Sequence, residues 1–144
     1  MALTASVARK DTEVSIIEYP VKAGELIFAG AIVALQAGYA VKGKTALNLR
    51  VKGIAKTYAD NSTGSDGGKT VAVELCHCVK GLRLFALAND TGSGNVLTQA
   101  DVGSDVYLKD DTTVSKSSAS NTRSLAGELM GFNEDGLPLV CFNK

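Results

Sequence analysis

Short apolar stretches separated by glycines and polar clusters run along most of the chain. The clearest pattern lies in residues 70–79. Its apolar side chains fall on alternate positions, at Val71, Val73, Leu75 and Val79. Because successive side chains of a strand point to opposite faces, this alternation predicts a half-buried β-strand, with His77 at the remaining position of the apolar face. Apolar residues resume over residues 82–88, which predicts a hairpin around residues 79–82.

The C-terminal part has the same character. Two apolar stretches, residues 125–132 and 137–142, flank the sequence NEDG, and Asp-Gly between apolar runs is typical of a hairpin. Residues 97–102 are predicted to form one helical turn, and residues 109–122 form a hydrophilic stretch whose one apolar residue is Val114. Many short strands without a long helix predict an all-β fold, a single small β-sandwich or β-barrel.

The N-terminal part differs from the rest. Residues 1–11 are small, polar or charged and show no period, whereas residues 12–19 are rich in β-branched side chains. Pro20 ends this segment, because proline cannot donate to a strand ladder. We therefore expect an extended N-terminal arm or edge strand over residues 1–20, followed by a β-domain over residues 21–144.

The composition and charge of the chain argue against two classes of partner, nucleic acids and membranes. The chain has 144 residues, with 15 Lys and Arg against 15 Asp and Glu, so its formal net charge is zero. A nucleic-acid-binding domain usually carries an excess of basic residues, so no nucleic-acid partner is expected. The longest apolar run, residues 26–35, is half of the roughly 20 residues that span a bilayer, and residues 1–10 lack the apolar core of a secretory signal. No membrane partner is expected.

Three cysteines, Cys76, Cys78 and Cys141, cannot all pair with one another, and the first two are too close for an easy bridge. Free thiols in a reducing compartment are therefore predicted. A metal site is not predicted, because His77 would face away from both neighbouring cysteines in a strand, and the chain has no other histidine.

No catalytic arrangement emerges from the sequence. The single histidine diverges from the adjacent thiols, and no G-x-S-x-G nucleophile elbow is present. The loop of residues 64–70 has only three residues between Gly64 and Gly68, and a strand follows it, so it is interpreted as a turn and not as a phosphate-binding loop. The loop acids are expected to be solvated; they are Asp60, Asp66, Asp90, Asp110 and Asp111. We expect neither enzymatic activity nor a cofactor.

The alternative is a small β-barrel binding or carrier module without enzymatic activity of its own. Residues 21–33 have the strand, tight turn and strand of small barrels such as biotinyl and lipoyl carrier domains. Such carriers present a modified lysine at a hairpin tip, and Lys80 is the comparable residue here. Its neighbours, Val79 and Gly81, are not the methionine or acidic residues typical of that tip.

Seven segments in a fixed order carry a resemblance to a known family. They are VKAGELI (21–27), AIV (31–33), VKGIA (51–55), TVAVE (70–74), VLTQADVGSDVYL (96–108), LAGELMGF (125–132) and LPLVCF (137–142). Together they resemble the capsid cement, or head decoration, proteins of tailed phages. In these small β-rich proteins, "V-x-G-I-A" and "G-D-x-V-Y" recur in this order. Here Ser104 stands where the second motif has its glycine, and Gly103 precedes it.

The resemblance implies a structural protein of the virion, made in the host cytoplasm and bound to the capsid exterior where capsomers meet. Its partners would be the major capsid protein and further copies of itself, as a trimer or dimer. The implied function is to stabilise the mature shell. A net charge of zero is compatible with a protein that contacts the shell and not the packaged genome.

The capsid-contacting residues are predicted to lie in the N-terminal arm. They are Glu13, Val14, Ile16, Ile17 and Tyr19. Our hypothesis is that this apolar, β-branched segment pairs with a capsid strand by β-augmentation, in which backbone bonds give affinity and alternate side chains give register. The other interpretation is an ordinary edge strand of the same domain.

Overall fold

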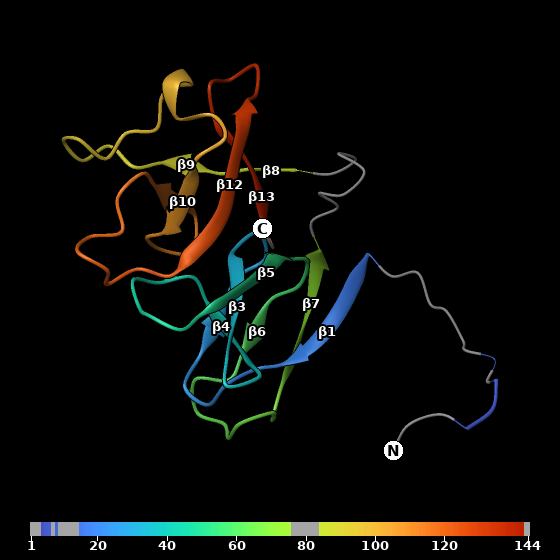
Figure 1. The fold of residues 1–144 in the computed structure, drawn as a ribbon. Helices are drawn as coiled ribbons and strands as arrows, with labels where there is room; N and C mark the ends of the chain where they lie inside the picture. The colour runs from blue at the N-terminus through green and yellow to red at the C-terminus, as the bar shows by residue number, and fades with distance from the viewer. Residues whose placement is uncertain (1–3, 7, 9–14, 76–83, 143–144) are drawn as a thin grey trace.

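A computed structural model describes residues 4–6, 8, 15–75 and 84–142 of the chain (Figure 1). Almost all of its regular structure is β-strand, apart from one 3₁₀ turn, η1 (Gln99–Asp101). The predicted all-β fold is therefore confirmed. The predicted helical turn within residues 97–102 is confirmed as well, and the Asp101 carboxylate accepts hydrogen bonds from the Thr98 N–H at 2.8 Å and the Thr98 hydroxyl at 3.1 Å.

The first sheet is antiparallel and has five strands. In spatial order they are β1 (Ile16–Pro20), β7 (Thr70–Leu75), β5 (Arg50–Ala55), β3 (Ile32–Gln36) and β4 (Tyr39–Lys42). Val71 and Val73 are fully buried, which confirms the predicted inward face of residues 70–75. The rest of that prediction, including His77 and the hairpin around residues 79–82, lies outside the described residues.

The first sheet closes on itself at one end. Directly after β1, Val21 forms a parallel bridge with Ala40 of β4, and the Lys22 N–H donates to the Ala40 carbonyl at 3.0 Å. This joins the two outer strands of the sheet. The enclosed space holds Val21, Val33 and the two valines of β7, together with Ile27 from a short ribbon formed by β2 (Leu26–Ile27) and β6 (Ala59–Asp60).

The second sheet has six strands. In spatial order they are β8 (Phe85–Ala86), β13 (Pro138–Phe142), β12 (Leu125–Phe132), β10 (Asp105–Leu108), β11 (Thr113–Ser115) and β9 (Ala88–Asn89). Only Leu87 separates β8 from β9 along the chain, yet these two strands are the opposite ends of the sheet. One extended segment, residues 85–89, therefore binds both ends and closes the sheet into a barrel-like shape.

Each of the two large sheets has a glycine beside a shift of register. Gly53 of β5 pairs with Val33 where the register shifts, and Gly127 of β12 pairs with Val106 at a similar shift. A side chain at Gly53 would collide with the Glu74 carbonyl oxygen, and one at Gly127 with the carbonyl oxygen of Cys141. Both positions therefore require glycine because the neighbouring backbone approaches so closely.

The hairpin predicted at NEDG is confirmed between β12 and β13. The Asn133 side-chain oxygen accepts hydrogen bonds from the Asp135 N–H at 3.0 Å and the Leu137 N–H at 2.9 Å. Gly136 adopts a φ of 78°, which glycine adopts without strain. One element was not expected, since β11 lies in the stretch predicted to be merely hydrophilic. Its Val114 is fully buried.

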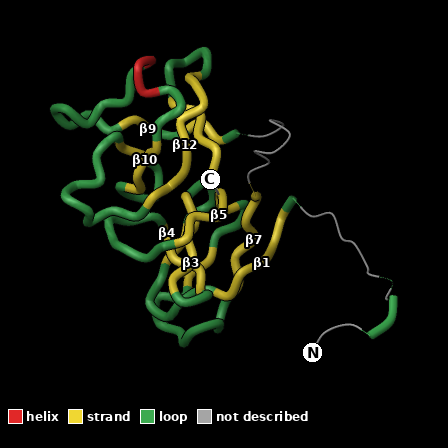
Figure 2. The backbone as a smooth tube through the Cα atoms, in the orientation of Figure 1, coloured by secondary structure: helices red, strands yellow, loops and turns green. Residues whose placement is uncertain are grey.

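The two sheets share a core. The larger buried cluster combines Ile32 and Val41 of the first sheet with Leu108, Leu129 and Phe142 of the second. Figure 2 shows the first sheet below and the second above, with β12 and β5 near their junction. The structure thus consists of two small curled sheets packed against each other.

Candidate functional site

Strand β1 contains three of the five residues predicted to contact a partner. Ile16, Ile17 and Tyr19 lie in β1, whereas Glu13 and Val14 lie outside the described residues. Figure 1 shows β1 at the rim of the first sheet, with β7 on its inner side. Their register runs antiparallel from Ile16 opposite Glu74 to Pro20 opposite Thr70. The segment is thus an edge strand of its own domain, with one side facing away from the sheet.

The hydrogen bonds at both ends of β1 show which backbone groups face β7. The Leu75 N–H donates to the Ser15 carbonyl at 2.8 Å, and the Val21 N–H donates to the Lys69 carbonyl at 2.8 Å. Since bonded and non-bonded pairs alternate in an antiparallel ladder, the backbone groups of Ile16 and Glu18 point outward. Within the described part of the chain, no hydrogen bond occupies these groups. As far as residues 15–75 and 84–142 are concerned, the first half of β1 is therefore an open sheet edge.

The side chains of β1 alternate between two environments. Tyr19 and Ile17 are half-buried, and Tyr19 packs against the core of the first sheet. Ile16 and Glu18 lie on the opposite face, where Ile16 is 46% exposed. An added strand would therefore meet one apolar and one acidic side chain on the outer face.

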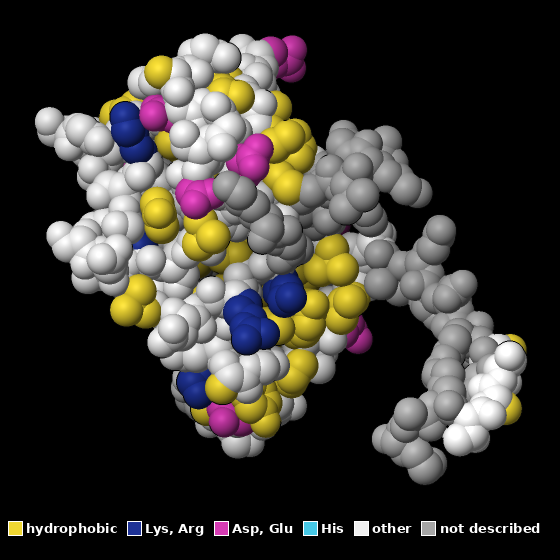
Figure 3. All heavy atoms as spheres, in the orientation of Figure 1, with side chains coloured by type: hydrophobic (Ala, Val, Ile, Leu, Met, Phe, Trp, Pro, Cys, Tyr) yellow, Lys and Arg dark blue, Asp and Glu magenta, His cyan; other side chains and the backbone are white. Residues whose placement is uncertain are grey.

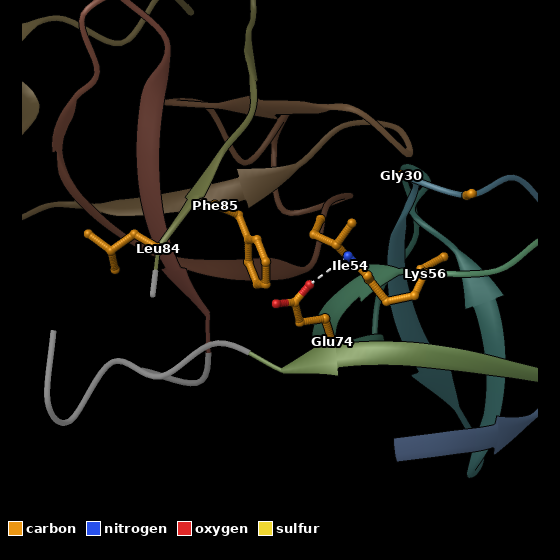
Figure 4. A pocket seen from close by; sticks show the side chains of 8 residues that line it. Gly30, Ile54, Lys56, Glu74, Leu84 and Phe85 are labelled. Atoms are coloured by element: carbon orange, nitrogen blue, oxygen red, sulfur yellow. Dashed lines mark ion pairs between the residues drawn. The ribbon is translucent and has the colours of Figure 1, made fainter. Parts of the chain in front are cut away.

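A pocket lies on the same face, further from the edge. It has a volume of about 520 Å³ and is lined by Ala29, Gly30, Ile54, Ala55, Lys56, Glu74, Leu84 and Phe85. Figure 4 shows Ile54, Lys56 and Glu74 on one side of it, with Phe85 of β8 opposite, so the pocket sits at the junction of the two sheets. The Lys56 ammonium and the Glu74 carboxylate form an ion pair at 3.2 Å. Glu74 stands opposite Ile16, which makes the pocket wall continuous with the open edge.

Two exposed aromatic side chains were not singled out from the sequence. Phe28 and Tyr58 are each 56% exposed, and their ring centroids are 5.7 Å apart. They flank β2 and β6, which pair Ile27 with Ala59. In the space-filling view, apolar side chains and Lys or Arg side chains lie next to one another over the first sheet (Figure 3). One sequence signal could have located this pair: Phe28 ends the apolar segment of β2, and Tyr58 directly precedes β6.

The prediction of free thiols is wrong for Cys141, which is disulfide-bonded. Spacing along the sequence could not show this, because Cys141 lies in the last strand and far from the other cysteines in the chain. Cys76, His77 and Cys78 lie outside the described residues, as does Lys80. Among the residues that are described, no group of three His, Cys, Asp or Glu side chains could hold a metal ion.

The prediction of solvated loop acids is wrong for Asp90. Its side chain is fully buried, the Lys109 ammonium lies 2.9 Å from one carboxylate oxygen, and the Arg123 guanidinium lies 3.7 Å from the other. Burial acts to raise the pKa of Asp90, but donation by the Gly92 N–H, Lys109 and Ser115 outweighs it and lowers the pKa to about 2. Because its pKa is about 2 and two cations pair with it, this carboxylate is ionised near neutral pH and is unsuited to donate or accept protons there.

Two other loop acids accept hydrogen bonds from backbone N–H groups within their own turns. Asp60 accepts from the Ser62 N–H at 3.0 Å, and Asp110 accepts from the Thr112 N–H at 2.9 Å. Hydrogen bonds from Ser62 lower the pKa of Asp60. Burial acts to raise the pKa of Asp110, but donation by Thr112 and Thr113 outweighs it and lowers that pKa. Such Asx turns are structural.

No helix in the described ranges, 15–75 and 84–142 included, has the length and apolar character needed to cross a membrane.

Comparison of the chain with protein-family models, with curated proteins and with solved structures finds no match.

Proposed function

We propose that this chain is a structural virion protein that binds the outer surface of a phage capsid at capsomer junctions and stabilises the mature shell. The observation that carries the proposal is the open outer edge of β1, at Ile16 and Glu18. In the described part of the chain, the outer strands of both large sheets are joined, through the bridge from Val21 to Ala40 and through residues 85–89. The order of the seven segments that resemble cement proteins supports the same function.

An open edge binds a partner by adding a strand. Ile16 and Glu18 each offer one N–H donor and one C=O acceptor to such a strand. At a net value of about 0.5–1.5 kcal/mol for each hydrogen bond, four bonds contribute roughly 2–6 kcal/mol. That is too little for stable attachment of a single copy. Tight binding therefore requires several copies to act together, as in the expected trimer or dimer, so that effective concentration multiplies a weak contact.

Stabilisation of the shell follows from mass action. A protein that binds the mature lattice, but not the separate subunits, shifts the equilibrium toward the assembled form. The zero net charge is compatible with this function, because the partner is protein and not nucleic acid. The disulfide at Cys141 is compatible with it too, since disulfides persist on virion surfaces.

Co-sedimentation with capsid shells tests the proposal. If a major capsid gene lies near the gene for this chain, shells are assembled from its product, matured, mixed with the purified chain and pelleted. We expect the chain to pellet with mature shells and to raise the temperature at which they disassemble. Absence of the chain from the pellet at micromolar concentration, or the absence of any capsid gene nearby, would contradict the proposal.

Two variants of Glu18 test the edge itself. Glu18→Pro removes the outward N–H without removing a bond to β7, and proline is tolerated on an edge strand when its position faces away from the sheet. Glu18→Thr keeps the N–H and replaces the carboxylate with a good strand-forming residue. We expect the proline variant to fold and to lose shell binding, while the threonine variant still binds. Equal binding by both variants would show that the edge is not used.

The carrier alternative has its own readout. Peptide mass spectrometry of the protein purified from its natural host should find Lys80 unmodified. A biotinyl or lipoyl adduct on Lys80 would favour the alternative instead.

A further inference from the structure

We infer that the strand added to β1 carries a basic side chain opposite Glu18 and an apolar, β-branched or aromatic side chain opposite Ile16. This inference rests on the proposed function, and it specifies the chemistry of the partner. Because Ile16 and Glu18 are two positions apart on one face, their partners are also two positions apart. The partner strand therefore has an apolar and a basic residue separated by one position, such as Val-x-Lys.

The charge requirement comes from Glu18. Its side chain is exposed, and no ion pair joins it to any other described residue. Its neighbour on β7 is Ala72, which offers no charge. Across the sheet, the residue that follows Ala72 is Lys56, whose N–H donates to the Ala72 carbonyl. The Lys56 ammonium is already paired with Glu74. A basic side chain on the added strand would stand directly beside Glu18 and give it an opposite-charge cross-strand pair.

The apolar requirement comes from Ile16. This side chain is 46% exposed at the outermost strand, and its inner neighbour Glu74 belongs to the wall of the 520 Å³ pocket. An apolar residue on an added strand would cover the outer side of Ile16. Cross-strand pairs of aliphatic or aromatic side chains stabilise antiparallel ladders, whereas a charged residue at this position would be desolvated against an aliphatic surface.

A second copy of this chain is a poor partner for the edge. An antiparallel β1 pair centred on Ile17 places Glu18 opposite Ile16 of the other copy. A pair centred on Glu18 places two carboxylates opposite each other, and it places Ile16 opposite Pro20, which has no N–H to donate. Both registers leave Glu18 without a basic partner. A strand of different sequence can place a basic residue opposite Glu18 and an apolar residue opposite Ile16.

Charge variants of Glu18 test the inference in the same shell-binding experiment. Relative to the unmodified chain, Glu18→Gln is expected to weaken binding about two- to threefold and Glu18→Lys about five- to tenfold. The difference between them should shrink in 0.5 M salt, because exposed ion pairs are screened. Glu134→Lys is the matched control, since Glu134 is exposed in the loop between β12 and β13 and is expected to leave binding unchanged.

Variants of Ile16 test the apolar requirement. Ile16→Val should bind shells within twofold of the unmodified chain, whereas Ile16→Asp should weaken binding at least tenfold. Thermal unfolding of each variant checks that the fold is retained, and Ile16→Thr serves as a milder polar variant if Ile16→Asp unfolds.

The outcomes separate this inference from the proposed function. If the unmodified chain fails to bind shells, the proposed function is wrong. If it binds, Glu18→Pro abolishes binding, and Glu18→Lys binds as well as or better than the unmodified chain, the edge is used but the partner is not basic, which overturns the inference alone. Binding of all Glu18 and Ile16 variants with unchanged affinity would overturn it as well.

Discussion

Asp90 is the most deeply buried charged residue among those described, with 1% of its surface exposed. A buried carboxylate is stable only when it is paired and hydrogen-bonded. Lys109 lies at 2.9 Å and Arg123 at 3.7 Å, and the Gly92 N–H donates at 3.0 Å. These groups come from three separate segments of the second sheet and its loops. Through these contacts, Asp90 connects the mainly polar segments around Gly92, Lys109 and Arg123.

Replacement of Asp90 by asparagine should be strongly destabilising. It keeps the shape of the side chain but leaves the Arg123 guanidinium, which is 10% exposed, without its counter-charge. Removing one partner of such a buried pair costs about 3 kcal/mol or more in the free energy of unfolding. Urea denaturation at pH 7 measures the change. Asp135→Asn, at an exposed turn residue, is the control and should stay within about 0.5 kcal/mol of the unmodified chain.

The lowered pKa of Asp90 predicts a pH dependence of stability. Because this pKa is about 2 in the folded chain and higher in the unfolded chain, the stabilisation is complete only above about pH 5 and is lost as the pH falls toward 2. Asp90 alone should account for a loss of about 2 kcal/mol between pH 5 and pH 2. Urea denaturation of the unmodified chain and of Asp90→Asn across this range isolates the effect. Parallel pH profiles for the two proteins would contradict it.

At the residue level, sequence alone could not locate this network. Asp90 sits in a run of polar residues, and nothing nearby along the chain marks it as different from Asp60 or Asp110. Its partners Lys109 and Arg123 lie in other segments and reach it only after the sheet has formed. Candidates at β1 were easier to identify, because the β-branched residues and Pro20 are adjacent in the sequence.

At the level of elements, two glycines beside bulges allow neighbouring strands to approach closely. Gly53 and Gly127 each lie at the middle of a strand, where glycine is normally unfavourable. Each permits a close approach of the neighbouring strand, at the Glu74 and Cys141 carbonyls respectively. Both belong to segments on which the resemblance to cement proteins rests, VKGIA and LAGELMGF. The glycine in each of these two segments is thus explained by the close approach of the neighbouring strand.

Two substitutions within β12 separate a required glycine from a dispensable one. Gly127→Ala places a methyl group against the Cys141 carbonyl and should destabilise the fold by about 3 kcal/mol or more, or prevent folding. Gly131→Ala meets no atom within 4 Å and should change stability by less than about 1 kcal/mol. Thermal unfolding and soluble yield compare the two. Similar stability of both variants would show that the strands can separate at Gly127 without cost.

Elements with a local signal were predictable from the sequence. The alternation at Val71 and Val73 and the turn at Asn133 to Gly136 identify strands through nearest neighbours alone. β8 and β9 are two residues long, and each pairs with a segment far away in the chain, whereas the three-residue β11 also pairs with the adjacent β10. Val114 shows the difficulty, since one apolar residue in a hydrophilic stretch gives no period from which to infer a strand.

At the level of the whole molecule, the disulfide at Cys141 joins the last strand to another part of the chain. Reduction should lower the free energy of unfolding by about 2–4 kcal/mol, because a cross-link restricts the unfolded chain. Thermal unfolding with and without a phosphine reductant measures this loss. Cys141→Ser should unfold at the lower temperature in both conditions. A reductant that leaves the unmodified chain unchanged would contradict the prediction.

Closure of the sheets is also a property of the whole molecule. Val21 bridges Ala40, and residues 85–89 hold both ends of the second sheet, so both closures join segments that no local pattern connects. The sequence supports an all-β fold through its many turns. Apart from the hairpin at residues 133–136, it does not show which strands become neighbours, because that choice is made by packing across the shared core.

The open edge of β1 has a consequence for how the protein behaves at high concentration. Growth of a β-fibre requires each molecule to accept a strand on one side and to offer another on the opposite side. In the described part of both large sheets, β1 is open only at Ile16 and Glu18, and its far end is joined to β4 next to Val21. Among the described residues of these sheets, a strand added at Ile16 and Glu18 would thus end at a sheet whose opposite strand, β4, is already joined to the chain at Val21. This arrangement disfavours fibre growth by successive strand addition.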